Sequence, residues 1–368
     1  MASQSILIIL LSWSFIIFFK CNSAYHFPSS MKAIEWLLMS YIIYGIIPII
    51  NGTELRISFS GQIISSYAYI KVALVSIIPI FVFFYYTKKN VISTETLCIL
   101  SYLFFIVIVI TFYANETKLL RLAIERNSTV TEFTNNVSYS FIFLIPYLYL
   151  FKKKARALIL LLGISVFLLM SMKRGAIILG VVVIFGFLYR ILADALVKKK
   201  VGVLMATIVF FVLMSNYIAD MYENSPYFQS RIEKTLEGNT SERDVILSSL
   251  MNYYLNETNI WQFLLGSGAS ATSEHAINVA HNDWVELLVD EGLVGFILLL
   301  AFFIYFFKDV QKMRRYSHQY YYMFLTIFII VFLRTFFSMS ICDMQPYLTL
   351  PFGFLLAKLS SYECKKSK

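Results

Sequence analysis

The sequence of 368 residues has little charge: only 14% of its residues are Asp, Glu, Lys or Arg, whereas soluble domains carry about 25%. Hydrophobic residues make up 59% of the chain, and the mean hydropathy is +0.71. These residues come in runs of about 15 to 22, which is long enough to cross a bilayer. The scarcity of charge therefore excludes an ordinary soluble domain and predicts an all-α, polytopic integral membrane protein.

Cysteine is also scarce, and the four cysteines follow no metal-ligand or disulfide spacing. We therefore expect neither a metal site nor a cofactor. The net charge of +9 does not predict nucleic-acid binding, because the basic residues form short clusters between apolar runs. That distribution is typical of the cytoplasmic loops of membrane proteins.

The apolar runs predict a bundle of about eleven transmembrane helices, because a segment in lipid must satisfy its own backbone hydrogen bonds. They lie at about 4–19, 33–50, 68–86, 94–113, 137–151, 157–172, 175–192, 201–219, 292–307, 321–340 and 347–361. The first run lacks a basic N-terminal region and a small-residue cleavage site, so we interpret it as a retained span. A signal peptide cut near Ala24 is the alternative.

The distribution of basic residues predicts the orientation of the chain. If the segment before residue 201 lies inside and the loop 220–283 outside, most of the 31 Lys and Arg residues fall inside. We therefore expect helices 1–8 in 1–219, a long extracytoplasmic loop in 220–283, and helices 9–11 with a cytoplasmic tail in 284–368. Within the loop, Val245, Leu247, Leu250, Met251 and Leu255 have helical spacing, which predicts an amphipathic helix on the membrane face.

The stretch 264–295, LLGSGASATSEHAINVAHNDWVELLVDEGLVG, concentrates two histidines and five carboxylates just before an apolar run resumes. His281 is the candidate general base, because histidine has a near-neutral pKa and takes a proton from an attacking hydroxyl. Asn282 is a supporting residue, and Asp283 or Glu286 would orient the imidazole. The alternatives are a solvated loop histidine and, for Asp283 and Glu286, a helix capping box. His275 is expected to have no role.

Glu291 is a further candidate site residue, because a carboxylate near the membrane interface is costly unless it is paired or hydrated. Gly292 and Gly295, three residues apart, predict close helix packing. Gly266 and Gly268 form a Gly-x-Gly sequence. It lacks the strand–helix context of a nucleotide-binding fold, so it offers only limited support for phosphate binding.

Several cations on the predicted outer face favour a bound anion. Lys173 and Arg174 interrupt two apolar runs there, and arginine suits phosphate through its planar, bidentate guanidinium. A tight hairpin with snorkelling side chains is the alternative. Arg334 lies inside the tenth span, which indicates either a functional residue or a structural pair with Asp343. Arg243 in the long loop completes the set.

These residues resemble a known family. The pattern H-N-x-x-x-E-L-L-x-x-E-G-x-x-G, which begins at His281 and follows a long outer loop, is similar to that of the bacterial O-antigen polymerase and O-antigen ligase superfamily. Residues 171–176, SMKRGA, resemble its Ser-x-Ser-Arg-Gly-Ala hairpin, with Lys173 in place of the second serine. Residues 241–243, SER, resemble its loop Ser-Gly-Arg, with Glu242 in place of glycine. The sequence resemblance covers residues 160–310. Elsewhere the chain resembles the family only in its predicted membrane topology.

The resemblance implies a glycosyltransferase that uses a glycan linked to undecaprenyl diphosphate at the outer face of the bacterial plasma membrane, without a metal or nucleotide sugar. Arg174, Arg243, Arg334 and Lys173 would bind the diphosphate, and His281, Glu286 and Glu291 would carry the catalytic chemistry. The implied partners are membrane lipids, a chain-length regulator and a flippase. We expect a polymerase that joins lipid-linked repeat units.

Two alternatives stay open. An O-antigen ligase, which moves the glycan onto the lipid A core, shares the same motifs. A lipid-linked oligosaccharide flippase belongs to another class, but charged residues within spans are few here and no internal repeat is present.

Overall fold

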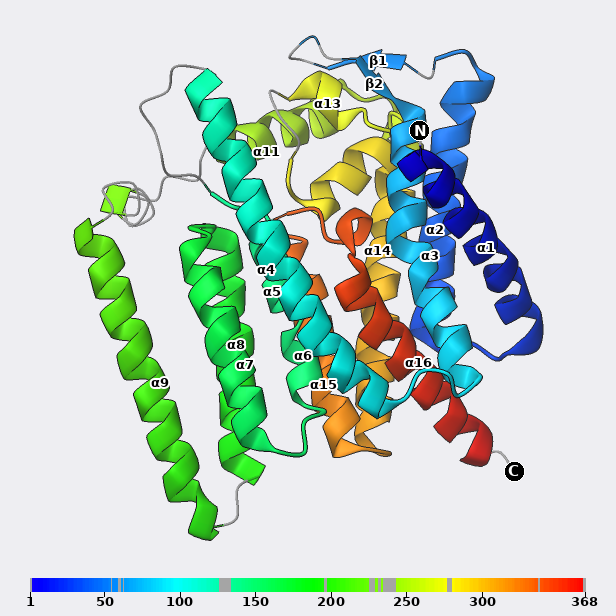
Figure 1. Ribbon diagram of the computed structural model, residues 1–368. Helices are drawn as coiled ribbons and strands as arrows, with labels where there is room; N and C mark the ends of the chain where they lie inside the picture. The colour runs from blue at the N-terminus through cyan, green and yellow to red at the C-terminus, as the bar shows by residue number, and fades with distance from the viewer. Residues whose placement is uncertain are drawn as a thin grey trace. The chain divides into compact units, whose positions relative to one another are not determined.

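The computed structural model describes residues 2–53, 55–58, 61, 63–125, 134–194, 197–224, 229–230, 233, 243–276, 280–336 and 338–366. Its described part is almost entirely helical, which confirms the all-α prediction. The chain forms two compact units (Figure 1): unit 1 comprises residues 1–93 and 241–368, and unit 2 comprises residues 94–240. Ser241 and Glu242, which belong to the predicted SER motif, lie outside the described residues.

Unit 2 is built from α4 (Thr94–Glu125), α5 (Ser138–Ile142), α6 (Ile145–Leu148), α7 (Lys154–Met170), α8 (Arg174–Asp194) and α9 (Val197–Asn224). The predicted span 137–151 is not one helix but the two short helices α5 and α6. Pro146 explains the break, because it lacks the N–H that would bond to Ile142 and its ring disfavours a continuous helix. Both short helices are fully buried within the unit.

Unit 1 begins with α1 (Ala2–Ala24), α2 (Ser29–Ile50), the antiparallel hairpin of β1 (Leu55–Ile57) and β2 (Ile63–Ser65), and α3 (Ser66–Lys88). It resumes with α11 (Arg243–Asn252), the π-helix η1 (Tyr253–Glu257), α12 (Ile260–Leu265) and α13 (Thr272–His275). It ends with α14 (Asp283–Arg314), α15 (His318–Arg334), the 3₁₀ turn η2 (Ile341–Asp343) and α16 (Pro346–Lys366).

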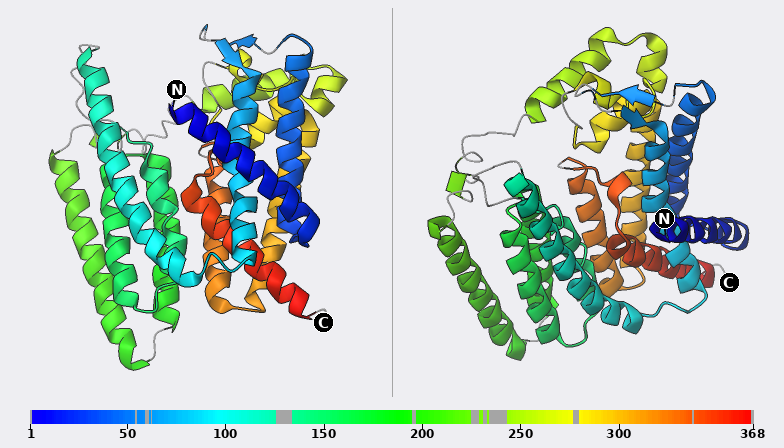
Figure 2. Two further views of the ribbon diagram at one scale, coloured as in Figure 1. Left: turned by 45° about the vertical axis from the view of Figure 1, so that its right-hand side comes forward. Right: turned by 45° about the horizontal axis from the view of Figure 1, so that its top comes forward.

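The core of unit 1 lies among its long helices. The helix α3 packs against α1, α2 and α16, and α14 packs against α2 and α15 (Figure 2). Close approach of α16 to α3 depends on Gly353, because a side chain there would collide with the α3 backbone at Ile80 and Phe84. This packing brings α2 and α3, from the start of the chain, beside the first turns of α14.

The predicted helix in 243–255 is confirmed as α11, continued by η1. Its packing face consists of Ile246, Leu250, Tyr253 and Tyr254, which join Val289 of α14 in a separate apolar cluster. Val245 and Leu255 are instead exposed, so only part of the predicted apolar face packs inside the protein.

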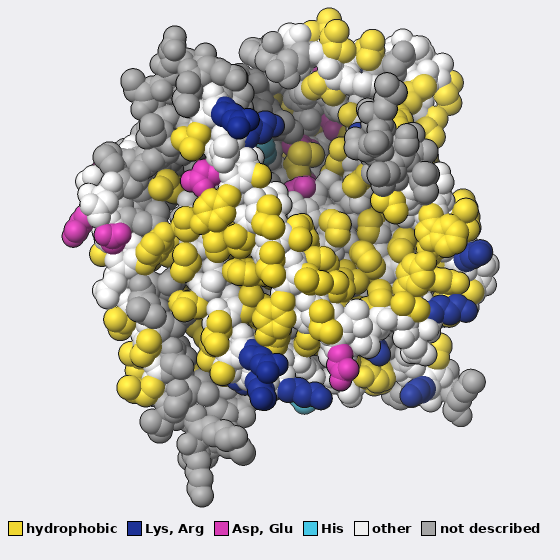
Figure 3. All heavy atoms as spheres, viewed as in Figure 1, with side chains coloured by type: hydrophobic (Ala, Val, Ile, Leu, Met, Phe, Trp, Pro, Cys, Tyr) yellow, Lys and Arg dark blue, Asp and Glu magenta, His cyan; other side chains and the backbone are white. Residues whose placement is uncertain are grey.

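Exposed apolar stripes indicate that the protein is membrane-embedded. Hydrophobic side chains cover a broad area of the visible described surface (Figure 3). On α4, Ile99, Leu103, Ile106 and Ile110 follow one helix face and are all at least half exposed, which a water-soluble surface rarely tolerates. Five described helices are long and apolar enough to cross a membrane: α2, α3, α4, α8 and α14. The number of eleven spans and the segments 1–219, 220–283 and 284–368 stay predictions.

Candidate functional site

The site is organised by a kink in α14. At Gly292 the backbone has φ 68° and ψ −159°, a region that is essentially restricted to glycine. The interruption releases carbonyl groups from the helical pattern, and two of them accept hydrogen bonds from the preceding loop. Ser267 N–H donates to the Val289 carbonyl and Gly268 N–H to that of Asp290, both at 2.9 Å.

The Gly-x-Gly sequence is a structural partner of this kink. A Cβ at Gly292 would collide with the backbone of Gly266 and Leu264, and one at Gly266 would collide with that of Asp290. Close packing at Gly292 is therefore confirmed, but it is made with the loop after α12. Both loop glycines have positive φ angles, of 78° and 97°, which explains their presence without a phosphate.

Asp290 and Glu291, two adjacent carboxylates before the kink of α14, are tied to other elements by hydrogen bonds. Asp290 accepts the backbone N–H groups of Ser270 (3.1 Å) and Thr272 (3.0 Å), which fixes the loop before α13. Glu291 is fully buried and accepts hydrogen bonds from the Ser40 hydroxyl and from the Tyr69 hydroxyl, the latter at 2.8 Å. The expectation that Glu291 needs polar partners is met by α2 and α3.

The predicted capping box of Asp283 and Glu286 is wrong. Asn282 is the N-cap of α14, and its side chain accepts from the N–H groups of Trp284 and Val285. Asp283, which is buried, instead accepts the N–H groups of Ser340 (2.7 Å) and Ile341 (3.1 Å). Asparagine is an equally good N-cap one residue earlier, which leaves Asp283 available to fix the turn after α15.

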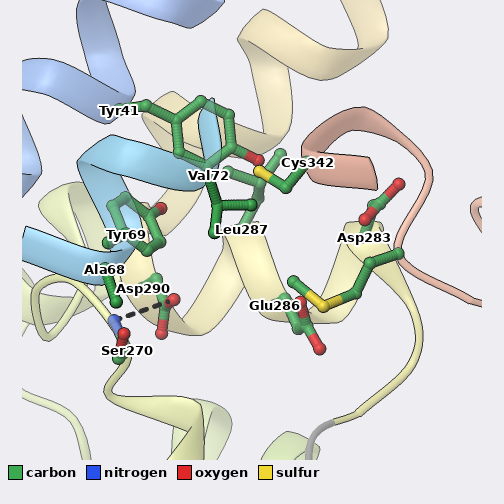
Figure 4. Close-up of a pocket in the computed structure, with 11 residues that line it drawn as sticks. Tyr41, Ala68, Tyr69, Val72, Ser270, Asp283, Glu286, Leu287, Asp290 and Cys342 are labelled. Carbon is green, nitrogen blue, oxygen red and sulfur yellow. Dashed lines mark hydrogen bonds between the residues drawn. The ribbon is translucent and has the colours of Figure 1, made fainter. Parts of the chain in front are cut away.

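Glu286 faces a cavity of about 170 Å³ within unit 1 (Figure 4). The lining residues come from α2, α3, the loop before α13, α14 and the segment around η2: Tyr41, Ala68, Tyr69, Val72, Ser270, Asp283, Glu286, Leu287, Asp290, Met339 and Cys342. Asp283, Glu286 and Asp290 lie three and four residues apart on α14, a spacing that places them on one helix face. Three carboxylates therefore line a single cavity.

His281 lies at the turn that leads into α14. Its backbone is in the left-handed region, with φ 51°, which few residues other than glycine adopt, and its side chain is half-buried. The Glu286 carboxylate interacts with the backbone N–H groups of His281 and Ala280. Glu286 thus holds the turn that carries the predicted base.

The basic residues that were predicted to bind an anion lie in different structural environments. Arg334 is 2% exposed and donates to the Asp343 carboxylate and, at 3.0 Å, to the Asp343 backbone carbonyl, which is the structural pair considered above. Arg243 is half-buried at the start of α11 in unit 1. Lys173 and Arg174 are half-buried at the turn between α7 and α8 in unit 2, so the helical hairpin of the alternative is present, and anion binding there stays a prediction.

Several residues of the site were not predicted. Ser40 and Tyr69 bind Glu291, and the Tyr41 hydroxyl and Cys342 sulfur point toward one another at the cavity wall (Figure 4). Arg56 of β1 donates to the Glu274 carboxylate at 2.7 Å and to the Ser267 carbonyl at 2.6 Å, so it holds the Gly-x-Gly loop. In the sequence these residues are isolated polar positions near helix ends, and only the pairing of distant elements makes them part of a site.

His275 has a packing role. Its ring stacks on Tyr253 of η1, with ring centroids 3.5 Å apart and an interplanar angle of 15°. Burial lowers the pKa of His275 below its usual value, because an imidazolium loses hydration there. The prediction of no chemical role is consistent with this contact.

Among the described residues, no group of His, Cys, Asp and Glu has the arrangement of a metal site. The chemistry available at the cavity is therefore that of hydrogen-bond acceptors, phenolic side chains and, at its margin, the His281 turn. No protein-family model matches this chain, and a comparison with curated proteins finds none that is similar to it.

Proposed function

We propose that this protein is a membrane-embedded glycosyltransferase of the O-antigen polymerase type, which joins polyprenyl-diphosphate-linked repeat units. One observation carries the proposal. The residues of the H-N-x-x-x-E motif converge in three dimensions: His281 occupies a strained turn, Asn282 caps α14, and Glu286 extends from the cavity wall back to the amide of His281. Strained backbone at a helix entrance is a frequent feature of functional sites.

The proposed reaction needs a base and a stabilised leaving group. A hydroxyl oxygen of the receiving sugar attacks the anomeric carbon of the donor glycan, and the bond from that carbon to the diphosphate oxygen breaks. His281 accepts the hydroxyl proton. The polyprenyl diphosphate leaves with the bonding electron pair, and cationic side chains stabilise its developing charge.

Among the proposed diphosphate ligands, Arg243 lies at the start of α11 in unit 1, and Arg174 and Lys173 lie at the turn between α7 and α8 in unit 2. Arg334 is already paired with Asp343, and a buried arginine with an acidic partner is a weaker ligand for a further anion. We therefore assign Arg334 a supporting role in the proposal. The active site is proposed to face the outer side of a bacterial plasma membrane.

The proposal is tested by gel analysis of surface polysaccharide in a strain that lacks this gene and carries plasmid copies. Wild type should give a ladder, whereas His281→Ala should leave a single repeat unit on the core, because loss of a general base costs about 10²- to 10⁴-fold in rate. The matched control is His318→Ala, since His318 is an exposed histidine at the start of α15, and it should keep the ladder.

Each other outcome has a defined meaning. Bare core together with accumulated lipid-linked polymer would identify a ligase. Lipid-linked repeat units retained at the inner face would identify a flippase. A normal ladder from a well-expressed His281→Ala variant would contradict the proposed base.

A further inference from the structure

The polar groups that line the cavity of unit 1 include three carboxyl groups and two donors that are already engaged within the protein. Asp283, Glu286 and Asp290 contribute carboxylates. The Tyr69 hydroxyl donates to Glu291, and the Ser270 N–H donates to Asp290. A ligand that enters this cavity must therefore bring its own hydrogen-bond donors.

Glu286 is the lining residue that lacks such a hydrogen-bond donor. Its side chain is 8% exposed, and its Oε1 atom is buried without a hydrogen-bond partner in the described part of the chain. A buried carboxylate oxygen without a partner is energetically costly. A hydroxyl or amino group of a ligand would satisfy it.

The cavity offers no cation to an anionic ligand, because none of the described residues that line it is Lys, Arg or His. The neighbouring cations are already paired, Arg334 with Asp343 and Arg56 with Glu274. Three carboxylates line the cavity, and Glu291 lies directly behind them. A phosphate or a carboxylate brought to this position would leave water without a cation among the described lining residues to compensate its charge, which is costly.

The size and the apolar lining of the cavity restrict the class of ligand further. A volume of about 170 Å³ suits one six-membered ring, since an apolar cavity of about 150 Å³ takes a single benzene. Tyr69, Val72 and Leu287 provide apolar surface beside the carboxylates (Figure 4). A ring with hydroxyl groups at its edge and C–H groups on its faces matches both parts of the wall.

We propose that this cavity binds one sugar ring that carries no acidic group, with a ring hydroxyl or amino group donating to Oε1 of Glu286. Resting on the proposed function, the bound ring is the sugar whose hydroxyl receives the glycan. The donor sugar is bonded directly to a diphosphate, for which the described lining of the cavity supplies no cation. The receiving sugar lies at the far end of its own repeat unit, away from any phosphate.

The test measures sugar binding to the purified full-length protein in nanodiscs, by saturation-transfer NMR and thermal shift, without turnover. The probes are glucose, galactose, glucosamine and galactosamine, compared with glucuronic acid, galacturonic acid and glucose 1-phosphate. At least one neutral or amino sugar should bind, and the three acidic probes should not.

Two variants locate the binding. Glu286→Gln should weaken affinity about tenfold, because an amide replaces the carboxyl group that accepts the ligand's hydrogen bond, whereas Glu223→Gln, at an exposed position on α9, should not. Ala68→Phe tests the site without altering a polar group, since Ala68 is exposed and lines the cavity. The larger side chain should block binding while the ligand-free melting temperature stays unchanged.

The inference is overturned if no neutral or amino sugar binds, if acidic sugars bind equally well, or if Ala68→Phe binds like wild type. Its failure differs from failure of the proposed function. A protein that binds sugar as expected but keeps its polysaccharide ladder in His281→Ala would retain the sugar cavity and lose the proposed base.

Discussion

At the scale of single residues, the site depends on backbone conformations that ordinary side chains disfavour. Gly292 creates the kink that turns the acidic start of α14 against the Gly-x-Gly loop, and His281 occupies a left-handed turn before it. A helix without this kink would retain the carbonyls of Val289 and Asp290 in its own hydrogen-bond pattern. The loop 266–268 would then lose its anchor, and Asp290 would lose its position.

We predict that Gly292→Ala destabilises the protein by about 3 kcal/mol, because alanine adopts this backbone region only with strain and its Cβ would meet the backbone of Gly266 and Leu264. Thermal unfolding of the purified variant measures the change. Gly186→Ala in α8 is the control, since a Cβ there has no neighbouring atom within 4 Å, and it should unfold like wild type. Equal stability of the two variants would exclude an essential kink.

At the scale of elements, the ion pair of Arg334 and Asp343 links the end of α15 to η2, directly beside the Asp283 contacts with Ser340 and Ile341. We predict that Asp343→Ala destabilises the protein by roughly 2 kcal/mol. This is below the value of about 3–5 kcal/mol for a fully buried pair, because the Asp343 side chain is 51% exposed.

The double variant Arg334→Met with Asp343→Ala distinguishes structure from function. It should regain most of the thermal stability, because no buried charge is left alone. Polymerisation should return with it if Arg334 has only a supporting role. A stable double variant without a polysaccharide ladder would instead make Arg334 a ligand of the diphosphate.

The packing of α13 on η1 should depend on pH through His275. Its pKa in the folded protein is lowered by burial, so the unfolded chain binds the proton more readily. The resulting stability is present above the unfolded pKa of about 6.5 and is lost as the pH falls below it. The melting temperature of wild type relative to that of His275→Phe, which keeps a ring on Tyr253, should therefore fall from pH 8 to pH 5. A difference between the two proteins that stays constant over this range would assign the pH dependence to other groups.

The sequence predicts the secondary-structure elements better than it predicts the side-chain contacts between them. Long apolar runs define most helices of the described chain, and Gly266, Gly292 and His281 stand out as unusual positions. Pro146, however, divides the predicted span 137–151, and Asn282 takes the N-cap position expected for Asp283. Ser40, Tyr41, Tyr69 and Arg56 lie more than 200 residues before their partners at the site. Local pattern carries no information about such pairings, because they depend on how α2 packs against both α3 and α14.

At the scale of the whole molecule, the sidedness of the membrane decides whether the site can meet its proposed substrate. The distribution of Lys and Arg predicts that the end of α9 lies outside and the C-terminal segment inside. We predict that a membrane-impermeant maleimide labels Glu223→Cys in intact cells. The exposed Cys364 of the wild-type protein should react only after permeabilisation. The reverse pattern would invert the topology and place the cavity on the wrong side for a lipid-linked glycan.

The most direct measurement of the central claim is product formation by the purified protein in liposomes that contain lipid-linked repeat units. Mass spectrometry of the extracted lipids should show glycans of two or more repeat units together with released polyprenyl diphosphate. His281→Ala should form none while it still binds the substrate. Absence of longer glycans with wild type, or their formation at an equal rate by His281→Ala, would contradict the account.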